Sequence, residues 1–356
     1  MPIIQADVSD TAYRKLKRMK EMQGYSAVTW GRWLTETSRN VSLDPQAMER
    51  VHENTRKVML KLWMRNFAEN LPRIRDGKTI RDLTPSDPEK FPKGKAIVLG
   101  RGPSIFSHKH LDLIAADGSL DTFLVATDGI MPEMLKQSII PDLVVTVDGS
   151  EELLRYYDVP GLDYRGLKVA MVTQANPKVV QKALENGMEI YWWLPMGDLP
   201  TSPDSITYQE ICMTISDKNP QGVPSQEAGG NAGTAAWVMS WALLRRSPIA
   251  LTGFDFGYPT EFDITKSYYY SSFIKYLDPD PLIASLKAES VLDEIYHPVW
   301  STRALIDPVF KGYREALHRM LERLPRWVDT WNCTEGGTLW HDRLKCKGLA
   351  EFLALN

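Results

Sequence analysis

The chain has 356 residues, more than one compact core usually holds, so it predicts either two domains or one domain with extensions. Its net charge of −3 offers no field that would recruit nucleic acid or an anionic membrane. Cys212, Cys333 and Cys346 are odd in number and far apart, which argues against a disulfide framework and suits a cytoplasmic protein.

No segment has the features of a signal peptide or a membrane span. The N-terminus, M-P-I-I-Q-A-D, lacks a basic region followed by an apolar one. The longest apolar segment, 234–244, is too short to cross a bilayer and ends in two arginines. We therefore expect no membrane span and predict a buried helix over 234–244.

Residues 1–75 are predicted to form an N-terminal helical region. Helices are expected over 9–22, over 28–38 and from about 44 to 70. Segment 1–40 resembles a ribbon-helix-helix module, which would make a homodimer and touch DNA through its basic residues. A solvated helical face explains the same residues, so nucleic acid is not an expected partner.

Residues 76–94 are predicted to be a linker rich in proline and charged residues, and the sequence pattern changes after it. Residues 95–284 alternate apolar runs with amphipathic stretches, which is typical of parallel strands covered by helices. We predict an α/β, Rossmann-like, doubly wound and mostly parallel sheet here, followed by a C-terminal helical extension over 285–356. The predicted strands are 96–99, 123–127, 143–147, 168–172, 189–193 and 248–253.

A glycine turn, G-R-G-P-S, ends the first of these strands. Ligands of open α/β sheets bind outside the carboxyl ends of the strands, and a glycine turn there can aim backbone N–H groups at an anion. The predicted phosphate cradle consists of Gly100, Gly102, Pro103 and Ser104. A tight strand-to-helix turn without a ligand is the alternative.

Three aspartates are predicted at the ends of other strands. Asp128 and Asp148 each follow a strand and precede a glycine, and Asp255 lies in G-F-D-F-G after the strand at 248–253. Carboxylates in such places can hold Mg²⁺ or contact a sugar hydroxyl, although a single Asp-Gly is also a common turn.

A second glycine-rich segment, G-G-N-A-G-T, opens the helix predicted from residue 234. Its glycines permit close approach of a ligand, and the helix would present its positive end. We predict that it holds a donor through Gly229, Gly230, Asn231 and Thr234; helix packing through small residues is the alternative. His108 and His110, by contrast, are expected on a surface helix.

Taken together, these motifs resemble the 6-hydroxymethylpterin diphosphokinase MptE-like family, which also contains motility-associated factors implicated in flagellin glycosylation. The resemblance covers roughly residues 58 to 350. It rests on the ordered set W-M-R-N-F-A-E-N, G-R-G-P-S, I-I-P-D-L-V-V-T-V-D, G-G-N-A-G-T-A-A, G-F-D-F-G and N-C-T-E-G-G. It implies a Rossmann-like core that binds a nucleotide or a nucleotide-sugar.

The resemblance implies either of two reactions. The pterin branch implies Mg²⁺-dependent diphosphate transfer from ATP to a hydroxymethylpterin. The glycosylation branch implies sugar transfer from a nucleotide-sugar such as CMP-nonulosonate to flagellin or a surface protein. That branch commonly has a histidine in the second glycine motif, where this chain has Gly233 and Thr234.

Our leading hypothesis is a Mg²⁺-dependent transferase of the diphosphokinase type. Asp128 and Asp148 would position the metal, and Asp255 would face the acceptor as a base. Catalysis of this kind is mostly positioning and charge neutralisation, so glycines, carboxylates and a metal suffice. The alternatives are the glycosyltransferase and a nucleotide-binding regulator that dimerises through its N-terminal segment.

Overall fold

The computed structural model describes residues 45–85, 92–118, 121–202, 204–276 and 279–355. The predicted helices over 9–22 and 28–38, and the ribbon-helix-helix segment 1–40, lie outside these residues. The predicted third helix is confirmed as α3 (Pro45–Asp76). Among the described helices, none is long and apolar enough to cross a membrane.

Packing divides the chain into two units. One comprises the residues up to Glu53 with Asp263–Val291, and the other comprises Asn54–Phe262 with Leu292–Asn356. In the first unit, α11 (Tyr268–Tyr276) packs against α12 (Pro281–Glu289), with Tyr269 and Phe273 fully buried. The predicted boundaries at residues 75, 94 and 284 stay predictions.

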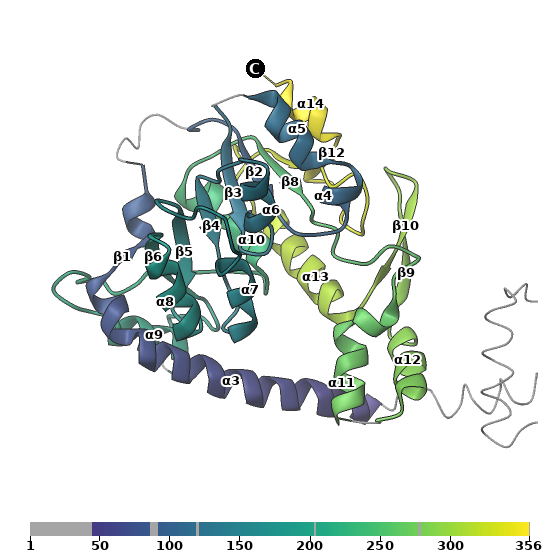
Figure 1. The fold of residues 1–356 in the computed structure, drawn as a ribbon, viewed down its shortest axis with the longest axis horizontal. Coiled ribbons are helices and arrows are strands. Elements are labelled where there is room, and N and C mark those ends of the chain that lie inside the picture. Colours follow the sequence, from purple (N-terminus) through teal and green to yellow (C-terminus); the bar gives the residue numbers. More distant parts are fainter. Residues whose placement is uncertain (1–44, 86–91, 119–120, 203, 277–278, 356) are drawn as a thin grey trace, which may run out of the picture. The chain divides into compact units, whose positions relative to one another are not determined.

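The second unit is built on a large parallel sheet whose strands run in the order β1-β6-β5-β4-β3-β2-β8-β11-β12. Figure 1 shows the part of this order from β1 to β8. This confirms the predicted α/β fold. The strands are β1 (Lys78–Thr79), β2 (Ala96–Leu99), β3 (Phe123–Thr127), β4 (Leu143–Val145), β5 (Lys168–Val172), β6 (Glu189–Pro195), β8 (Ile249–Thr252), β11 (Thr330–Asn332) and β12 (Leu344–Cys346). A short β7 (Ser225–Gln226) pairs with β6, and β9 (Asp293–His297) forms a hairpin with β10 (Thr302–Ile306).

Helices cover both faces of the sheet, as the doubly wound prediction requires. The remaining helices of this unit are α4 (Ser104–Ser107), α5 (His110–Asp117), α6 (Met131–Lys136), α7 (Leu154–Tyr157), α8 (Pro177–Glu185), α9 (Ile206–Met213), α10 (Ala232–Val238), α13 (Pro308–Glu322) and α14 (Leu349–Leu353). The predicted buried helix at 234–244 is α10 together with a π-helical turn, Met239–Leu243.

The central strands β2, β3 and β8 are apolar on both sides because each side faces a separate core. Along β2, Ala96 and Val98 lie in one hydrophobic cluster, whereas Ile97 and Leu99 lie in the other. Helix α10 packs against β2, β3 and β4, while α14 packs against α5 and β8. Period-two alternation between two apolar cores therefore explains the continuous apolar runs.

The C-terminal part differs from the helical extension that we predicted, because it adds β11 and β12 to the sheet beside β8. The two strands read T-W-N and L-K-C. Neither contains an apolar run, so the pattern that revealed the other strands is missing here.

Two asparagines tie α3 to the carboxyl edge of the sheet. The Nδ2 atom of Asn66 donates to the carbonyls of Gly149 (2.9 Å) and Gln174 (3.0 Å). The Nδ2 atom of Asn70 donates to the carbonyls of Thr173 (3.2 Å) and Ala175 (2.7 Å). Both asparagines are fully buried, so they supply the donors that the loops after β4 and β5 need.

We expect Asn70→Ala to lower the free energy of unfolding by about 1–3 kcal/mol, because two buried carbonyls would lose their donor. Urea unfolding should show a lower midpoint with an unchanged slope. Glu69→Ala is the matched control, since Glu69 is exposed in the same turn of α3. Equal midpoints for the two variants would contradict this role.

Candidate functional site

The candidate site lies at the topological switch point of the sheet. From β2 the chain builds outward through β3, β4, β5 and β6, and it then returns to place β8 on the other side of β2. The register pairs Leu99 of β2 with Ala126 of β3 and with Thr252 of β8, so the three strands finish together. A ligand crevice is expected outside these strand ends.

The loops after β2 and β8 are in direct backbone contact. The N–H of Gly100 donates to the carbonyl of Thr252 (2.8 Å), and the N–H of Gly102 donates to the carbonyl of Gly253 (3.0 Å). A Cβ atom on Gly100 would stand 2.6 Å from the Gly253 oxygen, and one on Gly102 would stand 1.8 Å from a carboxylate oxygen of Asp255. The two glycines of G-R-G-P-S are therefore required for this contact.

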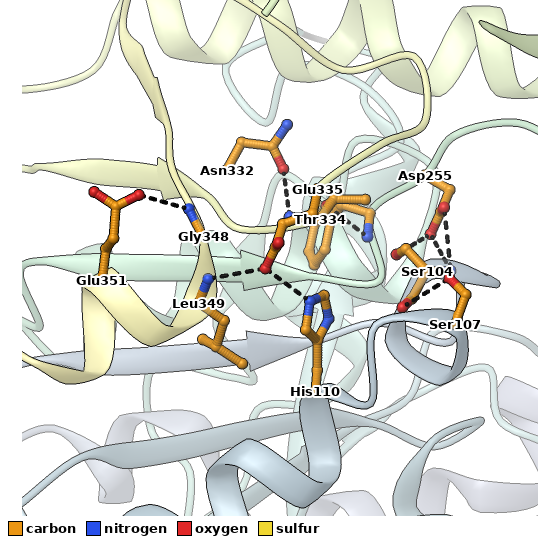
Figure 2. A network of polar contacts seen from close by, with 11 residues as sticks. Ser104, Ser107, His110, Asp255, Asn332, Thr334, Glu335, Gly348, Leu349 and Glu351 are labelled. Atoms are coloured by element: carbon orange, nitrogen blue, oxygen red, sulfur yellow. Dashed lines mark hydrogen bonds and ion pairs between the residues drawn. The ribbon is translucent and has the colours of Figure 1, made fainter. Parts of the chain in front are cut away.

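Ser104 and Asp255 are partners in the same contact, as Figure 2 shows. Ser104 donates through its hydroxyl to Asp255 Oδ2 (2.7 Å) and through its N–H to Oδ1 (3.3 Å). Asp255 is only 6% exposed, and this burial raises its pKa to about 6. The N–H groups of Gly100, Gly102 and Ser104 thus all have partners within the protein, and their role as a phosphate cradle, with the exposed Pro103, stays a prediction.

Asp128 is a buried carboxyl at the end of β3. Its Oδ2 accepts a hydrogen bond from the Thr146 hydroxyl (2.5 Å), and its Oδ1 accepts one from the N–H of Gly129 (2.7 Å). Burial raises the pKa of Asp128 to about 6, and the nearby Asp148 adds to the rise. Asp128 is therefore held by protein donors on both oxygens.

Asp148 stands in the same Asp-Gly context after β4, but its side chain is exposed. Its Oδ1 accepts from the N–H of Ser150 (2.9 Å). The surrounding protein and the charge of Glu152 raise its pKa, whereas Arg155 acts in the opposite direction. Of the two predicted metal ligands, Asp148 is the one with an oxygen left for an outside group.

Two arginines that the sequence analysis did not single out complete this part of the edge. Arg101, inside G-R-G-P-S, and Arg155, from α7, both approach the ring of Tyr156, at 5.6 Å and 4.9 Å from its centre. Both arginines are exposed. A Cβ on Gly129 would stand 3.1 Å from Arg101, so the Arg101 side chain reaches from the β2 loop to the loop after β3. In the sequence, the position of Arg101 inside the glycine motif could have identified it as a site residue.

The second glycine motif forms a closed cap on α10. Asn231 accepts from the N–H of Thr234 (2.9 Å) and donates to the Thr234 hydroxyl (3.0 Å). A Cβ on Gly229 would stand 2.5 Å from Thr234, and one on Gly230 would stand 2.7 Å from Tyr313. The glycines thus have a packing role, and a role of this loop in holding a donor stays a prediction.

The cap of α10 nevertheless lies at the same sheet edge. A Cβ on Gly233 would stand 3.0 Å from the ring of Phe254, the residue before Asp255. The structure therefore brings all the predicted residues to one edge, at the ends of β2, β3, β4 and β8 and the start of α10.

A third loop, after β11, contacts the loop after β8 at the switch point (Figure 2). The Thr334 hydroxyl accepts from the N–H of Phe254 (3.2 Å). Glu335 Oε1 contacts His110 Nε2 (3.2 Å) and accepts from the N–H of Leu349 (3.0 Å). His108 is exposed, as predicted, but His110 is fully buried, so the predicted surface position is wrong for His110. Burial lowers the pKa of His110.

Few side chains at this site are available to bind a metal ion. Within the described part of the chain, no three His, Cys, Asp or Glu side chains gather in a way that could hold an ion. Mg²⁺, however, is commonly bound by one or two carboxylates together with substrate phosphates. Asp148, with Asp128 behind it, fits that second arrangement.

Comparisons with known proteins identify a family and a similar fold. A model of the family described as "6-hydroxymethylpterin diphosphokinase MptE-like" matches residues 65–261, more than half of the chain. Among solved structures, the chain is similar to one described as the MAf glycosyltransferase from Magnetospirillum magneticum AMB-1, with 12% sequence identity and a TM-score of 0.50. The match covers 77% of this chain and 35% of that one, so the chain spans about a third of that protein, and the likeness is one of fold. No curated protein matches the chain.

We expect Gly102→Ala to lower the free energy of unfolding by about 1–3 kcal/mol or more, because the added methyl group would overlap the Asp255 carboxylate. Gly336→Ala is the control in the neighbouring loop, since a Cβ there meets no atom within 4 Å. Denaturant unfolding of both variants checks this. A Gly102→Ala protein as stable as the control would show that the two loops do not need this close approach.

The raised pKa of Asp128 predicts a pH-dependent stability. Because the folded pKa of about 6 exceeds the unfolded value of about 3.9, the native state binds the extra proton, and stability falls as pH rises from about 4 to about 6. The free energy of unfolding of Asp128→Asn should therefore rise by about 2–3 kcal/mol relative to that of the wild type between pH 4 and pH 7.5.

Asp163→Asn provides a control of opposite sign for that titration. Hydrogen bonds from Arg165 lower the pKa of the exposed Asp163 to about 2, so its small stabilisation is present above pH 4 and is lost as pH falls. Urea unfolding at several pH values measures both variants. A pH-independent difference between Asp128→Asn and the wild type would contradict the buried acid.

Proposed function

The chain belongs to the 6-hydroxymethylpterin diphosphokinase MptE-like family, and we propose that it is a transferase that binds a nucleotide donor at the carboxyl edge of its sheet. The observation that carries this proposal is the pair of exposed arginines, Arg101 and Arg155, that both approach the ring of Tyr156. Guanidinium groups bind phosphate oxygens through short, charge-assisted hydrogen bonds. Arg101 follows β2 at the switch point, where α/β sheets bind such ligands, and Arg155 follows β4 at the same edge of the sheet.

In the leading form of the proposal, the reaction is diphosphate transfer from ATP to a hydroxymethylpterin-like acceptor. Arg101 and Arg155 bind the phosphates and neutralise charge on the transferring group, and Asp148 faces the phosphates as the protein ligand of Mg²⁺. The metal, when bound, supplies further neutralisation of the phosphate charge. Asp128 holds the edge in place through Thr146 and Gly129.

The second candidate is sugar transfer from a nucleotide-sugar such as a CMP-linked donor to a protein acceptor. It is favoured by the similarity in fold to the MAf glycosyltransferase. The same arginines would then hold the phosphate of the donor, which is the leaving side in that reaction. The two candidates therefore share the donor site and differ in the acceptor.

We expect nucleotides to raise the melting temperature of the protein, since a ligand that binds only the native state stabilises it by mass action. Arg101→Ala and Arg155→Ala should each weaken nucleotide binding by about 10- to 100-fold, the effect of one charged hydrogen bond. Arg165→Ala is the matched control, because Arg165 is exposed and paired with Asp163. Equal binding by the three variants would place the donor elsewhere.

Product release distinguishes the two reactions. The protein is incubated with Mg²⁺, ATP and hydroxymethyl-dihydropterin, and separately with CMP-sugars. AMP release that requires the pterin supports diphosphate transfer, and CMP release supports sugar transfer. If neither product forms and no nucleotide changes the melting temperature, the transferase proposal fails.

A further inference from the structure

Three basic side chains gather on and beside helix α13. Arg314 and His318 stand four residues apart on the same face of the helix, and the ring of His341 lies 5.2 Å from that of His318. We call Arg314, His318 and His341 the α13 basic cluster. Among the described residues, no carboxylate forms an ion pair with any of the three. Groups that can carry positive charge are therefore brought together without a counter-ion from the protein.

Arg314 is half-buried and uses only part of its hydrogen-bonding capacity. Its Nη1 donates to the carbonyl of Thr338 (3.3 Å), and its guanidinium lies 5.6 Å from the centre of the Trp340 ring. The buried Nε has no hydrogen-bond partner, and Nη2 has none in the described part of the chain. Burial lowers the pKa of Arg314, because water solvates its charge incompletely. A bound anion would offset this cost.

The two histidines also have nitrogen atoms without a partner. The Nε2 atom of His318 is buried and forms no hydrogen bond. The Nδ1 atom of His341 accepts from the N–H of Arg343 (3.1 Å), so the neutral ring carries its proton on Nε2 and can donate it. Together with the guanidinium of Arg314, the two imidazoles form a set of donors that suits an anion.

The charges around His318 favour an anion over a metal ion. Burial, His341 and Arg314 lower the pKa of His318 to about 4, although Glu315 and Glu322 act in the opposite direction. Two neighbouring histidines can bind a metal, but in the described ranges no third His, Cys, Asp or Glu joins them in a metal-binding group. A cation would also be repelled by the guanidinium, whereas an anion would be attracted to it.

We propose that the α13 basic cluster binds a phosphate group distinct from those of the nucleotide donor. Arg314 and His341 donate N–H groups to its oxygens, and His318 adds a third donor by taking up a proton. A phosphate group suits three donors better than a carboxylate does, because it offers three acceptor oxygens. The inference concerns binding alone and does not depend on the proposed transferase activity.

The cluster adjoins the loop that carries Asp255 but lies across β8 from the arginines proposed for the donor. Thr338, whose carbonyl accepts from Arg314, donates through its N–H to the carbonyl of Asp255 (2.8 Å). In the sheet, β2 and β4, which precede Arg101 and Arg155, lie on one side of β8, and β11, which precedes Thr338, lies on the other. A phosphate on Arg314 is therefore held apart from the donor phosphates, with one residue between its arginine and Asp255.

Histidine signals test the binding directly. The chain has six histidines, so proton–carbon NMR spectra of the full chain contain few imidazole signals, and His318→Gln and His341→Gln assign the two of interest. We expect inorganic phosphate to shift both signals in a saturable manner at neutral pH, and chloride at equal ionic strength to leave them unchanged. No shift with phosphate, or the same shift with chloride, overturns the proposal.

A pH titration gives a signature that a purely structural histidine would lack. Sulfate, which carries two negative charges throughout the titration, should raise the pKa of His318 above its value of about 4. The proton affinity of His318 should increase by about tenfold or more, since a charged hydrogen bond favours the protonated ring by that factor. Equal pKa values in sulfate and in chloride would contradict the proposal.

Variants locate the phosphate on the molecule. Arg314→Gln should weaken phosphate binding by about 10- to 100-fold, the effect of one charged hydrogen bond. Arg323→Ala is the matched control and should bind phosphate as the wild type does, because Arg323 follows the same helix, is exposed and is paired with Glu227. Circular dichroism checks that both proteins are folded. Wild-type binding by Arg314→Gln would place the phosphate elsewhere and overturn the proposal.

Two crossed measurements separate this site from the donor site. Arg101→Ala should keep the response of His318 and His341 to phosphate, and Arg314→Gln should keep the rise in melting temperature that ATP causes in the wild type. Loss of either effect would merge the two sites and overturn the proposal. If ATP leaves the wild type unchanged, the donor proposal fails, and the histidine response to phosphate still decides this one.

Discussion

The site depends on the contact between the loops that leave β2 and β8. Two neighbouring strands usually diverge into separate loops at a switch point, but here Gly100 and Gly102 allow the backbones to pair for two further hydrogen bonds. Asp255 then locks the contact by holding Ser104 from the other loop. The loop after β11 and the cap of α10 both meet Phe254, which stands between Gly253 and Asp255 in this contact.

Much of the sheet could be predicted from the sequence, and the reason is physical. The strands at 96–99, 123–127 and 168–172 match the prediction at both ends, because they are continuous apolar runs in the interior of a parallel sheet. The strands β11 and β12 could not be found in this way, since T-W-N and L-K-C have no run of apolar residues. Strand β11 is held by pairing with β8, and β12 is held by pairing with β11.

The candidate site was predictable as a set of residues but not as a set of environments. Asp128 and Asp148 have the same local sequence, Asp-Gly after an apolar strand, yet one is buried beneath Thr146 and the other is exposed. The pairing of Ser104 with Asp255 likewise joins residues far apart in the chain. Such differences arise from neighbours that only the tertiary fold supplies, and no local pattern contains them.

The order in which the chain emerges during synthesis gives the β2–β8 pairing a further consequence. Strand β2 is made early and can pair at once with β3, but its other edge stays open until β8 has left the ribosome. Glu335, which contacts His110, and the N–H of Leu349, which donates to Glu335, appear later still. A nascent chain therefore carries a central strand with one unpaired edge while the residues between β2 and β8 are made, and this open edge is where a chaperone could protect the chain from aggregation.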